Sequence, residues 1–187
     1  MVHAVPRETF VQATRDLPEL QITEVVLQTA RWQEMKDWYS AFLGVEPFLD
    51  TETMCVRRVS NVHNQLFVLM HFPDLQDRPE SATGLNHAQF RCQTLGDTLD
   101  RYERLKAVGI VPERSMNHGP GTSFYYRDPD GNTMEISGPN FATIAEGRAY
   151  LQSDAFQRNP RGIAIDPDDF MAKFRSGVPQ AELVRIP

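Results

Sequence analysis

Apolar and polar positions follow one order that is written twice along the chain. In the first copy, residues 22–28 are rich in β-branched side chains and bounded by polar residues, which predicts a strand. From Trp32 onward, apolar residues recur at helical spacing until Gly44, a residue type that commonly ends helices. Further strands are predicted near residues 46–49, 54–59 and 65–72. The first copy is therefore read as strand, helix and three strands.

The second copy repeats this order. Residues 85–92 predict a strand, the spacing of apolar residues from Leu95 to Leu105 predicts a helix, and Gly109 closes it. Strands are then predicted near residues 111–115, 123–127 and 132–137. An internal repeat of this kind predicts two βαβββ modules.

The predicted fold class is α+β, with the two modules forming an incomplete, barrel-like mixed sheet around a cavity. The modules span residues 21–73 and 84–140, and the charged, proline-containing segment 74–83 links them. Residues 1–20 form an N-terminal extension. Residues 141–187 form a helical tail that packs on the modules.

Two helices are predicted in this tail. The first covers residues 142–156. The second begins at Asp166, which is followed by a proline in the first turn, and stops at Gly177. The tail is too polar for a core of its own, so it is expected to cover the cavity or to contact a partner subunit.

Strand alternation predicts which side chains face away from the helices. In the first strand Val25 and Leu27 form the apolar set beneath the helix, so their neighbours point to the opposite face. The same alternation in the other strands places further polar residues there. The predicted polar face carries Glu24, Gln28, His87, Gln89, Arg91, Thr133 and Glu135. A face this polar either meets solvent or lines a ligand cavity, and Gln28, Gln89, Arg91 and Ser123 are candidate substrate-binding residues.

Glu24, His87 and Glu135 are candidate metal ligands. Two enclosed carboxylates repel each other, and a divalent cation, a shared proton or Arg91 would offset that cost. One imidazole with two carboxylates suits Fe(II), Mn(II), Mg(II) or Zn(II), and three protein ligands leave positions for a substrate. The alternative is a wet sheet face on which Arg91 pairs with one glutamate.

The composition of the chain limits the classes of binding partner and the cellular setting that are expected. The 187 residues suit one domain or two small packed modules. A net charge of −6 and a pI near 5.4 argue against nucleic-acid and anionic-membrane partners, and the apolar runs are too short to span a bilayer. We read no signal peptide. Cys55 and Cys92 lack metal-type spacing, so a reducing, cytoplasmic setting is expected.

Three segments resemble the vicinal oxygen chelate superfamily. They are EVVLQTARWQEMKDWYSAFLG, GLNHAQF and NHGPGTSFYYRDPDGNTMEI. That superfamily includes type I extradiol dioxygenases, glyoxalase I, epimerases, and fosfomycin and bleomycin resistance proteins. The likeness is greatest to small two-module proteins similar to extradiol dioxygenases. It covers about residues 20–140 and extends into the tail.

The resemblance implies His87 and Glu135 as ligands of a divalent metal, with Fe(II) first among the candidates. It departs at Glu24, where a dioxygenase-like relative has histidine. It also implies a catalytic Tyr125, ten residues before Glu135. His118 lies in a glycine-rich loop at the predicted mouth of the cavity, and its ordinary pKa near neutrality suits proton transfer. Relatives are often dimers, so a homodimer is a further expectation.

The leading functional hypothesis is an extradiol-type oxygenase that uses O2 and a small, vicinally oxygenated aromatic substrate. A second is a non-redox isomerase, lyase or epimerase on the same scaffold, with Glu24 as base. A third is a metal-free small-molecule binding protein in which Arg91 neutralises the carboxylates.

Overall fold

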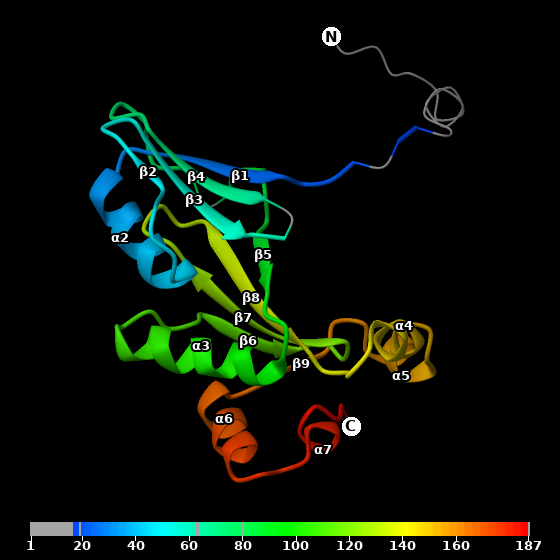
Figure 1. Ribbon diagram of the computed structural model, residues 1–187. Coiled ribbons are helices and arrows are strands. Elements are labelled where there is room, and N and C mark those ends of the chain that lie inside the picture. The colour runs from blue at the N-terminus through cyan, green and yellow to red at the C-terminus, as the bar shows by residue number, and fades with distance from the viewer. Residues whose placement is uncertain (1–16, 19, 63, 80, 187) are drawn as a thin grey trace.

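Two mixed β-sheets with helices packed against them make up the protein (Figure 1). The computed structural model describes residues 17–18, 20–62, 64–79 and 81–186. Within these residues, the first sheet has the order β1-β4-β3-β2 and the second has the order β5-β8-β7-β6-β9. The first sheet consists of β1 (Glu24–Thr29), β2 (Leu49–Asp50), β3 (Met54–Ser60) and β4 (Gln65–His71). The second consists of β5 (Ala88–Arg91), β6 (Arg114–Asn117), β7 (Gly121–Arg127), β8 (Thr133–Pro139) and β9 (Ile163–Ala164).

The helices begin and end where local chemistry favours it. They are α2 (Trp32–Leu43), α3 (Leu95–Ala107), α4 (Ile144–Leu151), α5 (Asp154–Arg158), α6 (Pro167–Arg175) and α7 (Gln180–Leu183). Gly44 ends α2 with a φ of 65°, a conformation that costs glycine little. Thr94 and Asp97 form a capping box that begins α3. The carboxylate of Asp166 accepts two backbone N–H groups at the start of α6.

The predicted α+β class and the repeated order of elements are confirmed. In each module the first strand runs parallel to the last, and the remaining pairings of the βαβββ unit are antiparallel. The two sheets do not close into a barrel: β1 and β5 are edge strands of separate sheets, and no hydrogen-bonded ladder joins them.

One hydrophobic core holds the modules together. Helix α2 packs on its own sheet and also reaches the second sheet, where the ring of Phe42 lies 5.6 Å from those of Phe90 and Tyr126. Helix α3 packs on the second sheet, and Phe170 of α6 and Val184 of the tail join the same core. Burying each such side chain contributes about 1.5–3 kcal/mol, so the tail is part of the folded unit.

Several predicted boundaries are wrong. Strand β5 begins at Ala88 rather than 85, and β6 begins at Arg114 rather than 111. The single helix predicted over residues 142–156 is two helices, because the Ser153 hydroxyl accepts the N–H of Phe156 and begins a new one. Short elements β9 and α7 were not predicted. Most of the predicted extension 1–20 lies outside the described residues.

Among the described residues, no helix is long and apolar enough to cross a membrane. Cys55 and Cys92 are both free thiols, the first buried and the second half-buried.

Candidate active site

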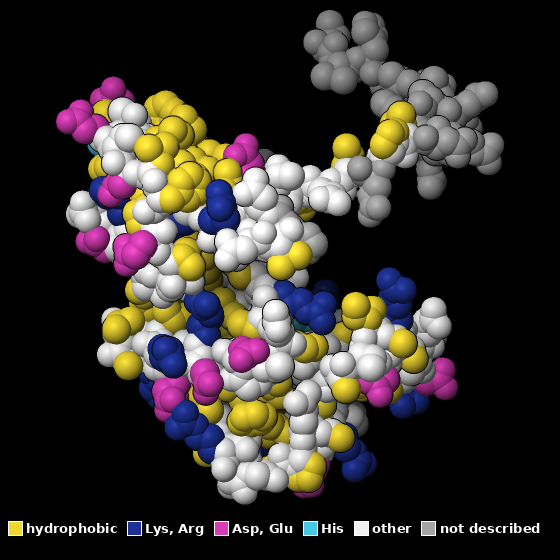
Figure 2. Space-filling view, in the orientation of Figure 1, with side chains coloured by type: hydrophobic (Ala, Val, Ile, Leu, Met, Phe, Trp, Pro, Cys, Tyr) yellow, Lys and Arg dark blue, Asp and Glu magenta, His cyan; other side chains and the backbone are white. Residues whose placement is uncertain are grey.

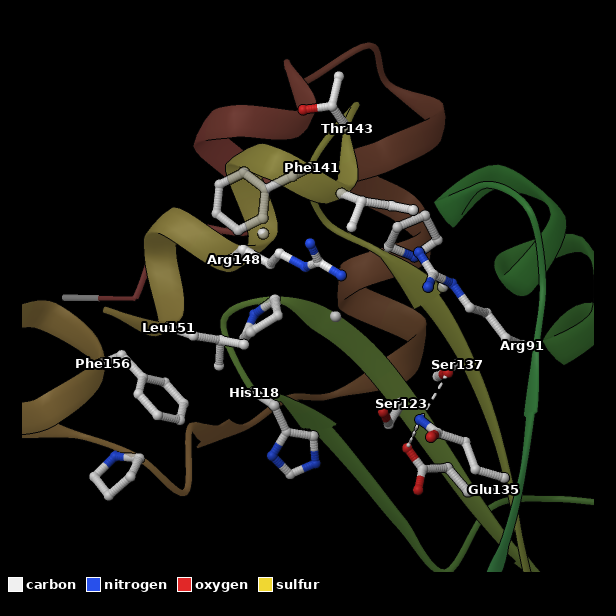
Figure 3. A pocket seen from close by; sticks show the side chains of 18 residues that line it. Arg91, His118, Ser123, Glu135, Ser137, Phe141, Thr143, Arg148, Leu151 and Phe156 are labelled. Carbon is white, nitrogen blue, oxygen red and sulfur yellow. Dashed lines mark hydrogen bonds between the residues drawn. The ribbon is translucent and has the colours of Figure 1, made fainter. Parts of the chain in front are cut away.

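A cavity of about 490 Å³ lies between the polar face of the second sheet and the tail (Figure 3). The sheet contributes polar side chains from β5, β7 and β8, among them Gln89, Ser123, Glu135 and Ser137. Strand alternation had placed Gln89 and Glu135 opposite the helices. Met134 and Ile136, their neighbours in β8, are buried in the core as predicted.

The tail supplies the opposite, mostly apolar wall. Phe141, Ile144, Leu151 and Phe156 line the cavity from α4, α5 and the segment before them. Helix α4 is held at its start by a capping box of Thr143 and Glu146. Tyr150 lies between the rings of Phe141 and Phe156, at centroid distances of 5.5 and 6.1 Å, and joins them into one aromatic cluster. Residues of the tail thus form one side of the cavity.

His87 and Glu135 are in direct contact at the site. Nε2 of His87 lies 2.9 Å from Oε2 of Glu135, and the glutamate side chain is only 4% exposed. The other ring nitrogen, Nδ1, lies 2.7 Å from Oδ1 of Asn86. Because an amide oxygen only accepts, Nδ1 carries a proton. The 2.9 Å between Nε2 and Oε2 is the distance of a hydrogen bond or ion pair.

Gln89 holds the glutamate in place. Its Nε2 atom donates to Oε1 of Glu135 at 2.9 Å and to the Ser137 hydroxyl at 3.0 Å. The register of the parallel β5–β8 pair, which sets Gln89 against Glu135, produces this contact. One carboxylate oxygen is thus fixed by an amide, and the other faces the imidazole. Hydrogen bonds of this kind orient carboxylates that bind metals.

Tyr125 and His118 form a second pair of side chains, which a hydrogen bond joins. The Tyr125 hydroxyl lies 2.9 Å from Nε2 of His118, and Nδ1 of the same ring lies 2.9 Å from the carbonyl oxygen of Arg161. Since the carbonyl only accepts, Nδ1 carries the proton of the neutral ring, and Nε2 accepts from the tyrosine. Burial and the nearby charge of Glu135 raise the pKa of Tyr125 above its ordinary value. The tyrosine therefore stays protonated at neutral pH.

The two pairs lie next to each other. The His87 and Tyr125 rings meet edge to face at a centroid distance of 5.6 Å, and β7–β8 pairing sets Tyr125 against Glu135. Histidine, glutamate, tyrosine and a second histidine therefore converge on one region of the polar sheet face. Proton donors and acceptors and two metal-type donor atoms are available within it.

The His87–Glu135 pair has the chemistry and spacing of two donors to one divalent cation. Donor atoms at about 2.1 Å from an ion and at right angles to each other are about 3 Å apart, close to the 2.9 Å between Nε2 and Oε2. An imidazole and a carboxylate suit the divalent metals of the middle of the first transition row. Two of the three predicted ligands fit a metal.

The third predicted ligand does not join them. Glu24 is exposed at the start of β1. Among the described residues, the ion pair of His87 is with Glu135 and not with Glu24. No group of three His, Cys, Asp or Glu side chains in the described part of the chain could hold a metal ion. Glu24 belongs to the first sheet, and no strand pairing fixes it against β5. Gln28, on the same strand, does not line the cavity.

Arg91 does line the cavity, but the predicted alternative in which it pairs with Glu135 is wrong. Glu135 is paired with His87 and bonded to Gln89 instead. Arg148 of α4 also lines the cavity and was not predicted. The sequence contained part of the evidence, because Ile144, Arg148 and Leu151 fall on one face of a helix. Nothing in the sequence, however, places that face against the sheet.

The chain belongs to the Glyoxalase/Bleomycin resistance protein/Dioxygenase superfamily. The sequence profile of that superfamily matches residues 21–136, which include the first module, most of the second, the His87–Glu135 pair and the Tyr125–His118 pair. The resemblance stated from the sequence is therefore confirmed.

Two curated relatives from Rhodococcus globerulus are similar over most of their length. Biphenyl-2,3-diol 1,2-dioxygenase 2 is 36% identical over 159 residues, which are 85% of this chain and 84% of the relative. Biphenyl-2,3-diol 1,2-dioxygenase 3 is 34% identical over 165 residues, which are 87% and 86% of the two chains. Both alignments are long enough to extend beyond the two modules.

Solved structures share the fold at lower identity. The lactoylglutathione lyase of Agrobacterium tumefaciens has a TM-score of 0.53 and 21% identity, covering 65% of this chain and 96% of its own. A glyoxalase/bleomycin resistance protein/dioxygenase from Nocardioides also has a TM-score of 0.53, with 17% identity and coverage of 71% and 91%. These matches support the α+β architecture of paired modules.

Proposed function

We propose that the chain is an extradiol-type dioxygenase, which opens the ring of a catechol-like diol beside its two hydroxyl groups and uses O2. The observation that carries this proposal is the His87–Glu135 pair, whose glutamate lines a cavity with a largely apolar opposite wall. The chain is also 36% identical to a biphenyl-2,3-diol 1,2-dioxygenase over 85% of its length. A biphenyl-2,3-diol is the natural first substrate to test.

In this proposal His87 and Glu135 hold a divalent metal, with Fe(II) as the expected ion. When bound, the metal supplies the redox chemistry that lets a diol react with O2. The chain's own contribution is to fix the donors: Asn86 orients the imidazole, and Gln89 orients the carboxylate. The predicted participation of Glu24 as a third ligand stays a prediction, and the structure gives it no contact with the pair.

Tyr125 and His118 manage protons in the proposed reaction. Nε2 of His118 is the unprotonated nitrogen, so it can accept the proton of a diol hydroxyl that takes the place of the Tyr125 hydroxyl beside it. The Tyr125 hydroxyl, which its raised pKa keeps protonated, then has a hydrogen to donate to a substrate oxygen. Ser123, on the same strand face, is a further hydrogen-bonding group that lines the cavity.

The apolar wall binds the remainder of the substrate and excludes water. Rings and methylene groups packed against Phe141, Leu151 and Phe156 gain about 25 cal/mol for each Å² removed from water. A cavity with a few polar groups at one side and apolar side chains at the other suits a diol with an apolar substituent.

Oxygen consumption tests the proposal. Protein purified without oxygen and loaded with Fe(II) is expected to consume one O2 for each biphenyl-2,3-diol cleaved. Glu135→Gln should abolish this uptake, and Glu113→Gln, which changes an exposed glutamate outside the cavity, should not. Turnover of the diol without oxygen uptake would favour the isomerase or lyase class instead.

A further inference from the structure

Two arginines from different parts of the fold face the same cavity. Arg91 stands at the end of β5, and Arg148 stands on α4 of the tail. Figure 3 shows the two side chains extending toward each other from opposite walls. Their guanidinium groups lie away from the part of the cavity that His118 and Glu135 occupy.

Neither arginine is neutralised within the described part of the chain. Ion pairs bind Arg31, Arg127 and Arg175 to aspartate or glutamate side chains, but none binds Arg91 or Arg148. The carboxylates that line or adjoin the cavity, and could have paired with these arginines, bind other groups. Those of Glu135 and Glu146 are taken up by the His87 contact and by the cap of α4.

Two unpaired guanidinium groups that face each other across a cavity repel, in a protein whose net charge is −6. An anion between them would remove this repulsion and make charge-assisted hydrogen bonds to both. Guanidinium groups bind carboxylates through two parallel N–H donors. The two side chains therefore offer the charge and the N–H donors that a carboxylate between the sheet and the tail would need.

We propose that Arg91 and Arg148 bind an anionic substituent of the diol, so that the preferred substrates are catechols carrying a carboxylate. The proposal rests on the function proposed above for the position of the diol. A ring placed beside His118 and Glu135 would direct a substituent across the cavity toward the arginines. The apolar side chains of the tail would then contact the carbon atoms between the ring and the carboxylate.

Binding of a matched pair of probes tests this inference. The probes are 3-(2,3-dihydroxyphenyl)propanoate and its neutral methyl ester, titrated calorimetrically into the metal-loaded protein without oxygen. The acid is expected to bind about tenfold more tightly than the ester, as for one or two hydrogen bonds to a charged group. Added salt should reduce this preference, because the arginines are exposed.

Substitutions show which residues cause the preference for the acid over the ester. Arg91→Gln and Arg148→Gln should each remove most of this preference, because they weaken binding of the acid much more than binding of the ester. Arg104→Gln, which removes the same charge from an exposed position on α3 outside the cavity, should retain it. Equal binding of acid and ester, or a preference that survives both cavity substitutions, would overturn the proposal.

The two proposals fail separately. If biphenyl-2,3-diol is cleaved with oxygen uptake but the acid has no advantage over the ester, the anion site is wrong and the ring-cleaving function stands. If the arginine-dependent preference is found but neither diol is cleaved, the anion site stands and the ring-cleaving function is wrong.

Discussion

The two modules share the βαβββ topology and the register of their parallel strand pair, but they differ in the side chains at the centre of the open face. In the first module, Val26 of β1 stands opposite Val68 of β4. The corresponding pair in the second module is Gln89 of β5 and Glu135 of β8. Parallel pairing in the same place thus joins two valines in one copy and an amide with a carboxylate in the other.

The antiparallel neighbour differs in the same way. Val56 of β3 is set against Val68, whereas Tyr125 of β7 is set against Glu135. The second module is also the one that the tail helices α4 and α5 cover. The comparison shows that the βαβββ unit positions side chains without determining their chemistry. Reactivity arises where polar residues occupy the outward positions and a wall encloses them.

Removing the carboxylate of the second module should have the largest effect. Glu135→Gln is expected to lower ring-cleaving activity by more than about a hundredfold, because it removes a proposed metal donor. Thermal unfolding should change little, because the amide can keep the hydrogen bond to Gln89. Initial rates of oxygen uptake and a melting curve measure both, with Glu113→Gln as the control.

Placing a carboxylate at the matching position of the first module should damage stability instead. Val68 is 6% exposed, and Val68→Glu would bury a charge beside Val26 and Val56, which offer no partner. A loss of about 2–4 kcal/mol in the free energy of unfolding is expected. Urea denaturation measures it, and Val62→Glu, at a position 85% exposed, should cost almost nothing. A loss in Val68→Glu no larger than that in Val62→Glu would show that the first module tolerates a carboxylate at this position.

Tyr125→Phe separates proton transfer from binding. The variant keeps the ring but loses the hydroxyl that donates to His118, so kcat should fall about tenfold or more while KM changes less. Tyr102→Phe is the matched control, because the Tyr102 hydroxyl bonds Asp168 outside the cavity. A fall confined to KM would make Tyr125 a binding residue only.

The smallest effect concerns the attachment of the tail to the second module. Lys106 and the Tyr102 hydroxyl hold the pKa of Asp168 below its ordinary value of 3.8. The stabilisation is present above the pKa of the unfolded carboxyl and is lost as the pH falls through the lower, folded value. Asp168→Asn should lower Tm by at most about 4 °C at pH 7. The two melting curves should converge in acid, and a constant gap would contradict the linkage.

The sequence predicted the repeated elements and the faces of the strands, because both depend on local periodicity. Alternation correctly placed Gln89, Arg91 and Glu135 on one face. Alternation does not determine how one sheet is placed relative to the other. It therefore could not show whether Glu24 contacts the His87–Glu135 pair. The role of Arg148 was also out of reach, because it depends on how the tail folds back over the sheet.

Metal affinity tests most directly the claim that the chemistry belongs to the second module. Fe(II) or Mn(II) binding is measured by calorimetry for the native chain and for His87→Ala, Glu135→Gln and Glu24→Gln. The two second-module variants should lose more than about tenfold in affinity, and Glu24→Gln should lose clearly less. A native chain that binds no metal, or a loss in Glu24→Gln as large as that in Glu135→Gln, would contradict the account.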